Sequence, residues 1–152
     1  MYRHILVAID DSDTSQKALQ EAITLAKLHG ASLDIAHAID EHLVHVFNAG
    51  GSTTASTHEL KHVLVAGGED VLGRAAAQAR AAGIEPTTRL LRGHGQHPDD
   101  LIAEAVEVAQ ADLLVVGSHG RRGVRRLLIG SVAENLVRKV GISVLIVRGL
   151  LG

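Results

Sequence analysis

Short apolar runs alternate with helical stretches along almost the whole chain, and this alternation limits the possible folds strongly. Strand-like runs are expected at Arg3–Ile9, Leu33–Ile39, Pro86–Leu91, Leu113–Val116 and Val144–Val147. The stretches between them have the 3.6-residue apolar period of helices. Strands that alternate with helices form βαβ units, which build a parallel sheet with right-handed crossovers. The sequence therefore predicts an α/β fold, and in such folds ligands bind at the carboxyl ends of the strands.

Four helices are expected between these strands. The first begins at Ser12 or Asp13 and ends at Gly30, the second runs from Glu59 to Ala82, the third follows Pro98, and the fourth covers Ser131 to Val140. Gly67-Gly68 interrupts the apolar pattern of the second helix, since glycine is a poor helix former. Residues 40–57 form the one long irregular stretch, and a mobile loop or lid is expected there.

A glycine-containing loop follows the fourth strand-like run. Gly117-Ser118-His119-Gly120 is separated by nine residues from Gly130-Ser131. Glycine allows the backbone to approach a ligand closely, because it has no Cβ. Ser131 and Glu134 fit a capping box, which would make Ser131 the N-cap of the fourth helix. A helix N-terminus offers unpaired N–H groups and a partial positive charge to phosphate, so this layout predicts a nucleotide site.

Basic residues lie in the spacer between these glycines, at Arg121, Arg122, Arg125 and Arg126. Arginine can bind phosphate oxygens through its planar guanidinium. A solvated basic loop and a local nucleic-acid patch are the alternatives, and the second is the weakest because the segment has no interleaved aromatic residues.

Asp10, at the end of the first strand-like run, is expected at the mouth of the same crevice. Its carboxylate could accept hydrogen bonds from ribose hydroxyls or from an adenine amine. Asp11, Ser12 or Asp13 would instead cap the first helix. We expect both roles together, with Asp10 for the ligand and Ser12 or Asp13 for the cap.

Several other motifs of catalytic or metal sites are absent or weak. The chain has neither the P-loop pattern G-x-x-x-x-G-K-[ST] nor the hydrolase pattern G-x-S-x-G. The segment His58 to His62 fits H-E-x-x-H, the zinc-protease helix motif, but a chain with ten histidines makes an accidental match more frequent. We therefore expect a solvated helix start there, and solvent-facing side chains at His94, His97 and His119. No catalytic residue and no metal ligand is assigned.

Composition limits the class of protein further. The 152 residues are enough for one domain, and the absence of cysteine excludes disulfides and suits a cytoplasmic location. A formal net charge of −2 argues against a nucleic-acid binder. No apolar run approaches the about 20 residues needed to span a membrane. The short first apolar run is followed at once by Asp10 and Asp11, unlike a signal peptide.

Three segments together resemble the universal stress protein family. They are the opening Ile5-Leu6-Val7-Ala8-Ile9-Asp10-Asp11-Ser12, the run ending in His37-Ala38-Ile39-Asp40, and the motif G-x2-G-x9-G-[ST] from Gly117 to Ser131. The resemblance covers essentially the whole chain. It implies one Rossmann-like domain over residues 1–152, with an open parallel five-stranded sheet in the order 3-2-1-4-5 and helices on both faces. It also implies a homodimer formed through the last strand, residues 142–147.

The glycine motif places the chain with the ATP-binding branch of that family. The resemblance implies nucleotide contacts at Ala8, Ile9, Asp10, Ala38, Val116, Gly117, His119, Gly120, Gly130, Ser131 and Val132. ATP is the implied ligand, with ADP or AMP as alternatives, and Mg²⁺ accompanies the phosphates. The expected function is nucleotide binding in stress response or signalling. Two alternatives stay open: a slow ATP hydrolase, with Asp11, Asp99 or His119 as the base, and a histidine-rich metal-binding protein.

Overall fold

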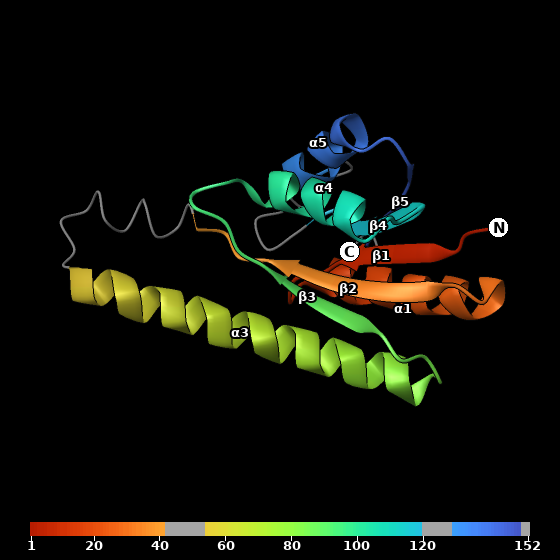
Figure 1. The fold of residues 1–152 in the computed structure, drawn as a ribbon, viewed down its shortest axis with the longest axis horizontal. Coiled ribbons are helices and arrows are strands. Elements are labelled where there is room, and N and C mark those ends of the chain that lie inside the picture. Colours follow the sequence, from red (N-terminus) through yellow and green to blue (C-terminus); the bar gives the residue numbers. More distant parts are fainter. Residues whose placement is uncertain (42–53, 120–128, 150–152) are drawn as a thin grey trace.

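The computed structural model describes residues 1–41, 54–119 and 129–149, of which residues 54–56 are described by their backbone. Strands and helices alternate along the chain as the sequence predicts (Figure 1). In order, the elements are β1 (His4–Ala8), α1 (Asp13–His29), β2 (Ser32–Ala38), α3 (Thr54–Ala81), β3 (Thr87–Leu91), α4 (Pro98–Val108), β4 (Leu113–Gly117), α5 (Ser131–Lys139) and β5 (Ser143–Val147).

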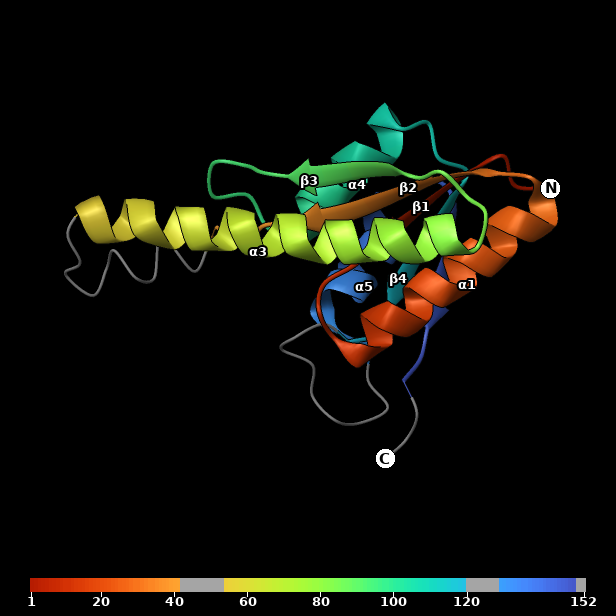
Figure 2. The ribbon, with the colours of Figure 1, turned by 90° about the horizontal axis from the view of Figure 1, so that it is seen from below.

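The strands form one parallel sheet in the order β3-β2-β1-β4-β5, which confirms the predicted topology. The chain moves outward from β1 through β2 to β3, and then returns to the other side of β1 with β4. Because the direction of winding reverses at β1, the crossover helices lie on opposite faces of the sheet. Helices α1 and α3 cover one face, and α4 and α5 cover the other (Figures 1 and 2).

An aliphatic core fills each face of the sheet. Successive side chains of a strand point to opposite faces, so Ile5 and Val7 of β1 pack on one side and Leu6 packs on the other. The first core includes Leu19, Ala22, Ile23 and Ala26 of α1 with Leu72, Ala75 and Ala79 of α3. The second includes Ile102, Ala105 and Val106 of α4 with Ala133 and Leu136 of α5.

Helix α3 differs from the prediction at its start. It begins at Thr54 rather than Glu59, so the last four residues of the predicted loop 40–57 are helical, while residues 42–53 lie outside the described part of the chain. The helix continues through Gly67-Gly68, as predicted, although these glycines interrupt its apolar pattern. A Cβ on Gly68 would lie 2.7 Å from Leu90 Cδ1 and 2.9 Å from His37 Cδ2. Glycine is therefore present because the helix approaches β2 and β3 closely, and the packing outweighs its poor helix propensity.

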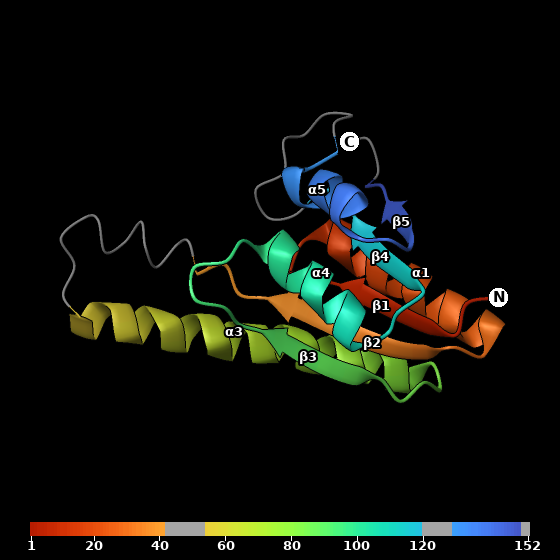
Figure 3. The same ribbon diagram turned by 45° about the horizontal axis from the view of Figure 1, so that its top comes forward.

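The N-terminal part of α3 projects beyond the sheet (Figures 1 and 3). A helix of 28 residues is about 42 Å long, whereas the strands have five to seven residues. None of residues 57–67 is buried, and contact with the core begins at Gly68. Among the described residues, no helix combines the length and the apolar character that a membrane span requires.

Candidate functional site

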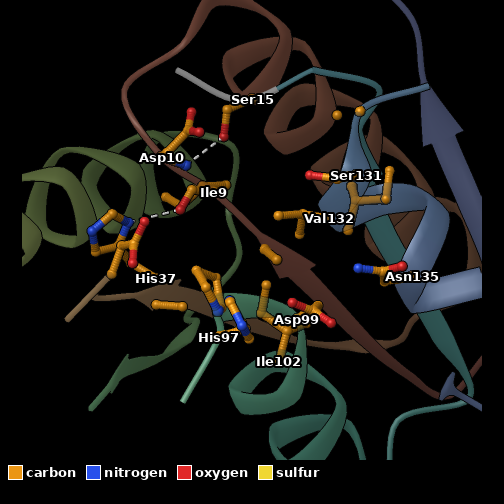
Figure 4. A pocket seen from close by; sticks show the side chains of 18 of the residues that line it. Ile9, Asp10, Ser15, His37, His97, Asp99, Ile102, Ser131, Val132 and Asn135 are labelled. Carbon is orange, nitrogen blue, oxygen red and sulfur yellow. Dashed lines mark hydrogen bonds between the residues drawn. The ribbon is translucent and has the colours of Figure 1, made fainter. Parts of the chain in front are cut away.

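A cavity of about 590 Å³ lies at the carboxyl ends of β1, β2 and β4, where the starts of α4 and α5 meet the sheet (Figure 4). This volume is in the usual range of small-molecule sites, about 300–1,000 Å³. It is lined by Ala8, Ile9, Asp10, Ser15, His37, Ala38, Ile39, Asp40, Leu64, His97, Pro98, Asp99, Ile102, Val116, Gly117, Ser118, His119, Gly130, Ser131, Val132, Ala133, Asn135 and Lys139.

The structure brings together every predicted contact residue that it describes. These residues are Ala8, Ile9, Asp10, Ala38, Val116, Gly117, His119, Gly130, Ser131 and Val132. Gly120 and the four arginines of the spacer lie outside the described residues. The predicted residues lie at or just after the ends of three strands and at the start of one helix, so their convergence follows from the strand order rather than from nearness in the sequence.

The wall of the cavity is apolar where the strands end. Ile9, Ile39 and Val116 line it and are buried, with exposed fractions of 8%, 4% and 4%. Ile102 of α4 completes this wall from the helical side. An apolar wall with polar groups at its edge is typical of sites that bind a flat, weakly polar ring.

Asp10 lies in a tight turn that leads into α1. Its Oδ1 accepts a 2.7 Å hydrogen bond from the amide of Ser12, and its own amide donates a 2.7 Å bond to Ser15 Oγ. Ser12 is the N-cap of α1, since its hydroxyl accepts from the amide of Ser15 at 3.2 Å. This confirms the predicted cap of α1, and the same turn places Asp10 at the edge of the cavity (Figure 4).

His37 of β2 also lines the cavity, and it contacts the backbone at the end of β1. Its Nδ1 lies 2.8 Å from the carbonyl oxygen of Ile9 (Figure 4). A carbonyl oxygen can only accept, so Nδ1 carries the proton and donates this bond. Sequence reasoning missed His37 as a side chain of the site, although it precedes the predicted contact Ala38.

Ser118 directly follows β4 and joins it to β5 and to the start of α5, and it is 1% exposed. Its amide donates to the carbonyl oxygen of Val147 at 2.8 Å, and its carbonyl oxygen accepts from the amide of Gly130 at 2.6 Å. Its hydroxyl lies 2.8 Å from His119 Nδ1. The sequence predicted solvent-facing side chains at His94, His97 and His119. His94 and His97 are exposed, but His119 is half-buried.

Helix α5 begins at Ser131, but the predicted capping box is wrong by one residue. Gly130 is the N-cap, with φ −61° and ψ 157°, and Ser131 is the first helical residue. The bond from Gly130 to Ser118 holds this extended conformation, while the carbonyl of Gly130 accepts from the amide of Glu134 at 3.0 Å. A Cβ on Gly130 would lie 3.0 Å from the Ser118 carbonyl oxygen. Backbone proximity, rather than an unusual φ, explains this glycine.

Gly117 also allows two backbones to approach each other. A Cβ at this position would lie 3.0–3.2 Å from side-chain and backbone atoms of Thr14 in the first turn of α1. The end of β4 and the start of α1 are therefore packed directly together beside the cavity.

An ion pair connects α4 and α5 at the rim. Lys139 Nζ lies 2.5 Å from Asp99 Oδ2 and also bonds Asp100. Hydrogen bonds to Asp100 and Asp99 raise the pKa of Lys139 above its ordinary value. Asp99, a candidate base by residue type, thus directs its carboxylate to an ammonium group.

Sequence reasoning missed the contributions of α5 beyond its first turn. Asn135 and Lys139 line the cavity together with Ser131. The three positions are spaced by four residues, which places them on one helix face. That spacing is the sequence signal that could have identified them. Leu64 of α3 has no such signal, because its position depends on how far the helix projects.

The described residues contain no group of three or more histidine, cysteine, aspartate or glutamate side chains that could hold a metal ion. His58 and His62 lie on exposed turns of α3, as expected for a solvated helix start. The H-E-x-x-H segment therefore has no third protein ligand in this part of the chain.

Comparison with known proteins agrees with the fold. The model of the universal stress protein family matches residues 1–148. The chain belongs to this family. Among curated relatives, universal stress protein YxiE of Bacillus subtilis is 33% identical over 151 residues, covering 97% of this chain and 100% of YxiE. Universal stress protein MJ0531 of Methanocaldococcus jannaschii is 31% identical over 148 residues, covering 97% of this chain and 83% of that protein.

Solved structures of the family have the same architecture. The structure of protein MJ0577 has a TM-score of 0.86 at 26% identity and covers 100% of this chain and 99% of that one. A universal stress protein in complex with cAMP has a TM-score of 0.68 at 32% identity, covering 96% and 97% of the two chains. The Archaeoglobus fulgidus protein in complex with dAMP has a TM-score of 0.68 at 25% identity, covering 96% and 98%.

Proposed function

We propose that the cavity binds an adenine nucleotide, with ATP as the principal ligand and ADP or AMP as alternatives. The observation that carries this proposal is the convergence of an apolar wall and a helix N-terminus in one cavity. Solved relatives in complex with cAMP and dAMP support the adenine moiety, since both ligands contain it.

The chemistry of the cavity suggests how the nucleotide lies. The ends of β1 and β2, with Ala8, Ile9 and Ala38, offer an apolar surface to the base. The Asp10 carboxylate at the edge suits ribose hydroxyls, which are hydrogen-bond donors. The phosphates would lie at Gly130, Ser131 and Val132, because the first amides of a helix have no acceptor within the helix.

Mg²⁺ fits this arrangement as a companion of the phosphates. Magnesium is usually bound by one or two carboxylates together with substrate phosphates and water. The described residues contain no dense cluster of acidic or histidine ligands. The phosphates would therefore supply most of the ligands of the ion, and Asp10 is a candidate carboxylate because it lines the cavity.

We propose a binding and signalling role in stress response, rather than catalysis, for residues 1–152 as one domain in the cytoplasm. The nucleotide would shift the protein between conformations that a partner distinguishes. Asp99, a candidate base for hydrolysis, is ion-paired with Lys139. A single-turnover assay with Mg²⁺ and ATP should detect no fast hydrolysis, and rapid turnover would favour the hydrolase instead.

We also propose a homodimer formed through β5. This strand is one edge of the sheet, and Val144, Leu145, Ile146 and Val147 are half-buried. An apolar edge strand is prone to association unless another segment covers it. Sedimentation of the purified chain should give a dimer, and a monomer at all concentrations would contradict this arrangement.

Isothermal titration with ATP, ADP, AMP and GTP tests the nucleotide proposal. We expect one adenine nucleotide per chain and weaker binding of GTP, because the apolar wall offers no partner for the additional polar groups of guanine. Equal affinity for ATP and GTP would contradict recognition of the base, and the absence of binding by all four would contradict the proposal as a whole.

A further inference from the structure

His58 and His62 form a closely spaced pair on the projecting part of α3, outside the cavity. They lie one helical turn apart, and their Nε2 atoms are 3.1 Å from each other. The ring centroids are 4.6 Å apart, with an angle of 87° between the ring planes. Both side chains are exposed, so water and ions can reach the two nitrogens.

The separation of the nitrogens is the one that a shared metal ion requires. Two imidazole nitrogens at about 2.0–2.1 Å from a metal, with an angle of about 90–109° between the bonds, lie about 2.8–3.4 Å apart. The observed 3.1 Å falls within this range. Residues four apart on a helix share a face, so the backbone already holds both ligands on one side.

We propose that His58 and His62 form a surface clamp for one divalent transition-metal ion of the class that prefers imidazole, namely Zn²⁺, Ni²⁺ or Cu²⁺. Water completes the coordination sphere. In the metal-free state the same geometry serves a hydrogen bond in which one neutral ring donates and the other accepts. When a metal ion binds, the donating ring transfers its proton from Nε2 to Nδ1 through water, and both Nε2 lone pairs coordinate the ion in place of the single hydrogen bond.

The clamp is distinct from a zinc-protease centre, although its sequence fits H-E-x-x-H. Such a centre needs a third protein ligand, and the described residues offer no group of three ligands. The clamp is therefore a binding site that stabilises structure, with no hydrolytic step assigned to it.

The expected consequence is local order in α3. Residues 57–67 have no buried side chain, and Gly67, a poor helix former, lies directly before the first contact of the helix with the sheet. The projecting turns therefore depend mainly on their own backbone hydrogen bonds, and they open more easily than the core. A metal ion that joins His58 to His62 adds its binding free energy to the helical state of these turns.

The test uses the untagged full chain, Zn²⁺ as the probe and no added nucleotide. The variants His58→Gln and His62→Gln each remove one ligand from an exposed position, so neither should disturb the fold. Loss of even an outer-shell partner of a metal site costs about 10–100-fold in affinity, so each variant should weaken Zn²⁺ binding by at least about tenfold. The control is His94→Gln, which removes an exposed histidine from a loop.

Isothermal titration should give one Zn²⁺ per wild-type chain, the same in His94→Gln, and loss of that site in the other two variants. Hydrogen exchange should show slower exchange of the amides of residues 57–67 with Zn²⁺ in the wild type, and no such change in His58→Gln. The proposal is overturned if the wild type binds no Zn²⁺, or if both variants bind it as tightly as the wild type. Failure here leaves nucleotide binding untouched, because the clamp lies outside the cavity.

Discussion

The amide of Gly130 donates a 2.6 Å hydrogen bond to the carbonyl oxygen of Ser118. This bond joins the start of α5 to the end of β4, two elements that are separated by the glycine loop in the sequence. It also aligns the first turn of α5 with the cavity, since Ser118, Gly130 and Ser131 all line it. Four predictions test how this arrangement and the surrounding packing act.

Replacing Gly130 by alanine should weaken nucleotide binding more than it weakens the fold. The new Cβ would lie 3.0 Å from the Ser118 carbonyl oxygen, so the start of α5 must shift by a few tenths of an ångström. We expect ATP affinity to fall about tenfold, which is about 1.4 kcal/mol, in isothermal titration. The free energy of unfolding should fall by about 1 kcal/mol in urea denaturation.

The matched control for this variant is Gly141→Ala. Gly141 follows the far end of α5, and a Cβ there would meet no atom within 4 Å. ATP affinity should be unchanged in this control. Equal affinities of Gly130→Ala and the wild type would show that the approach of Gly130 to Ser118 has no role in binding.

Ser131→Ala should leave stability almost unchanged, because Ser131 is the first helical residue and Gly130 is the cap. Ser12→Ala should cost about 1 kcal/mol of unfolding free energy, since Ser12 Oγ caps α1 by accepting from the amide of Ser15. Urea denaturation of both variants measures the difference. If Ser131→Ala cost as much as Ser12→Ala, the hydroxyl of Ser131 would be a cap after all. For the ligand, we expect weaker ATP binding by Ser131→Ala.

Gly68→Ala should destabilise the protein, although alanine is the better helix former. The added Cβ would lie 2.7 Å from Leu90 Cδ1 and 2.9 Å from His37 Cδ2, so α3 would have to move away from the sheet. Overpacking of this kind typically costs about 1–3 kcal/mol. Gly67→Ala is the matched control, since its Cβ would meet nothing within 4 Å and the unfolding free energy should not decrease. A gain in stability from Gly68→Ala would contradict the close approach of α3.

The Asp112 carboxylate should stabilise the folded protein at neutral pH, and this stabilisation should be lost in acid. Its carboxylate accepts from the amide of Arg3 at 2.9 Å and from that of His4 at 3.0 Å, at the start of β1. Burial acts to raise the pKa of Asp112, but these backbone hydrogen bonds outweigh it, so the pKa lies below the ordinary value of 3.8. A lowered pKa means that the folded state favours the ionised form, so the stabilisation is complete above about pH 5 and is lost as the pH falls through the folded pKa.

We therefore expect Asp112→Asn to lower the unfolding free energy by about 0.5–1 kcal/mol at pH 7. The difference from the wild type should shrink below about pH 4. Asp70→Asn is the control, because Asp70 pairs with Arg74 at the exposed surface and such pairs contribute little. A difference that stays constant from pH 7 to pH 3 in urea denaturation would exclude this role of the Asp112 carboxylate.

The strands were predictable from the residue pattern, and their order from the resemblance to the universal stress protein family. Apolar runs such as Leu113–Val116 are fully buried in a parallel sheet, so their pattern is strong, and glycine motifs mark the loops that follow them. The N-cap of α5 was not predictable to the residue. Ser131 has the better capping side chain, but the backbone bond between Gly130 and Ser118 decides where the helix begins.

The reason for a glycine inside a helix also depends on contacts that are distant in the sequence. Gly67-Gly68 interrupts the apolar pattern of α3, and the reason is that Gly68 faces Leu90 and His37 across a contact that the local sequence does not reveal. The ion pair of Asp99 and Lys139 was also not predictable from the local sequence. Their ion pair joins two helices that are close in space and distant in the chain.

The most direct test is to denature freshly purified, untagged protein and to identify any released nucleotide by mass and absorbance. We predict an adenine nucleotide at nearly one per chain, with ATP as the principal species. Release of ADP or AMP would still support a nucleotide site, and it would indicate either hydrolysis of ATP or a different natural ligand. No released nucleotide, followed by no binding of ATP on titration, would contradict the proposal that this cavity is a nucleotide site.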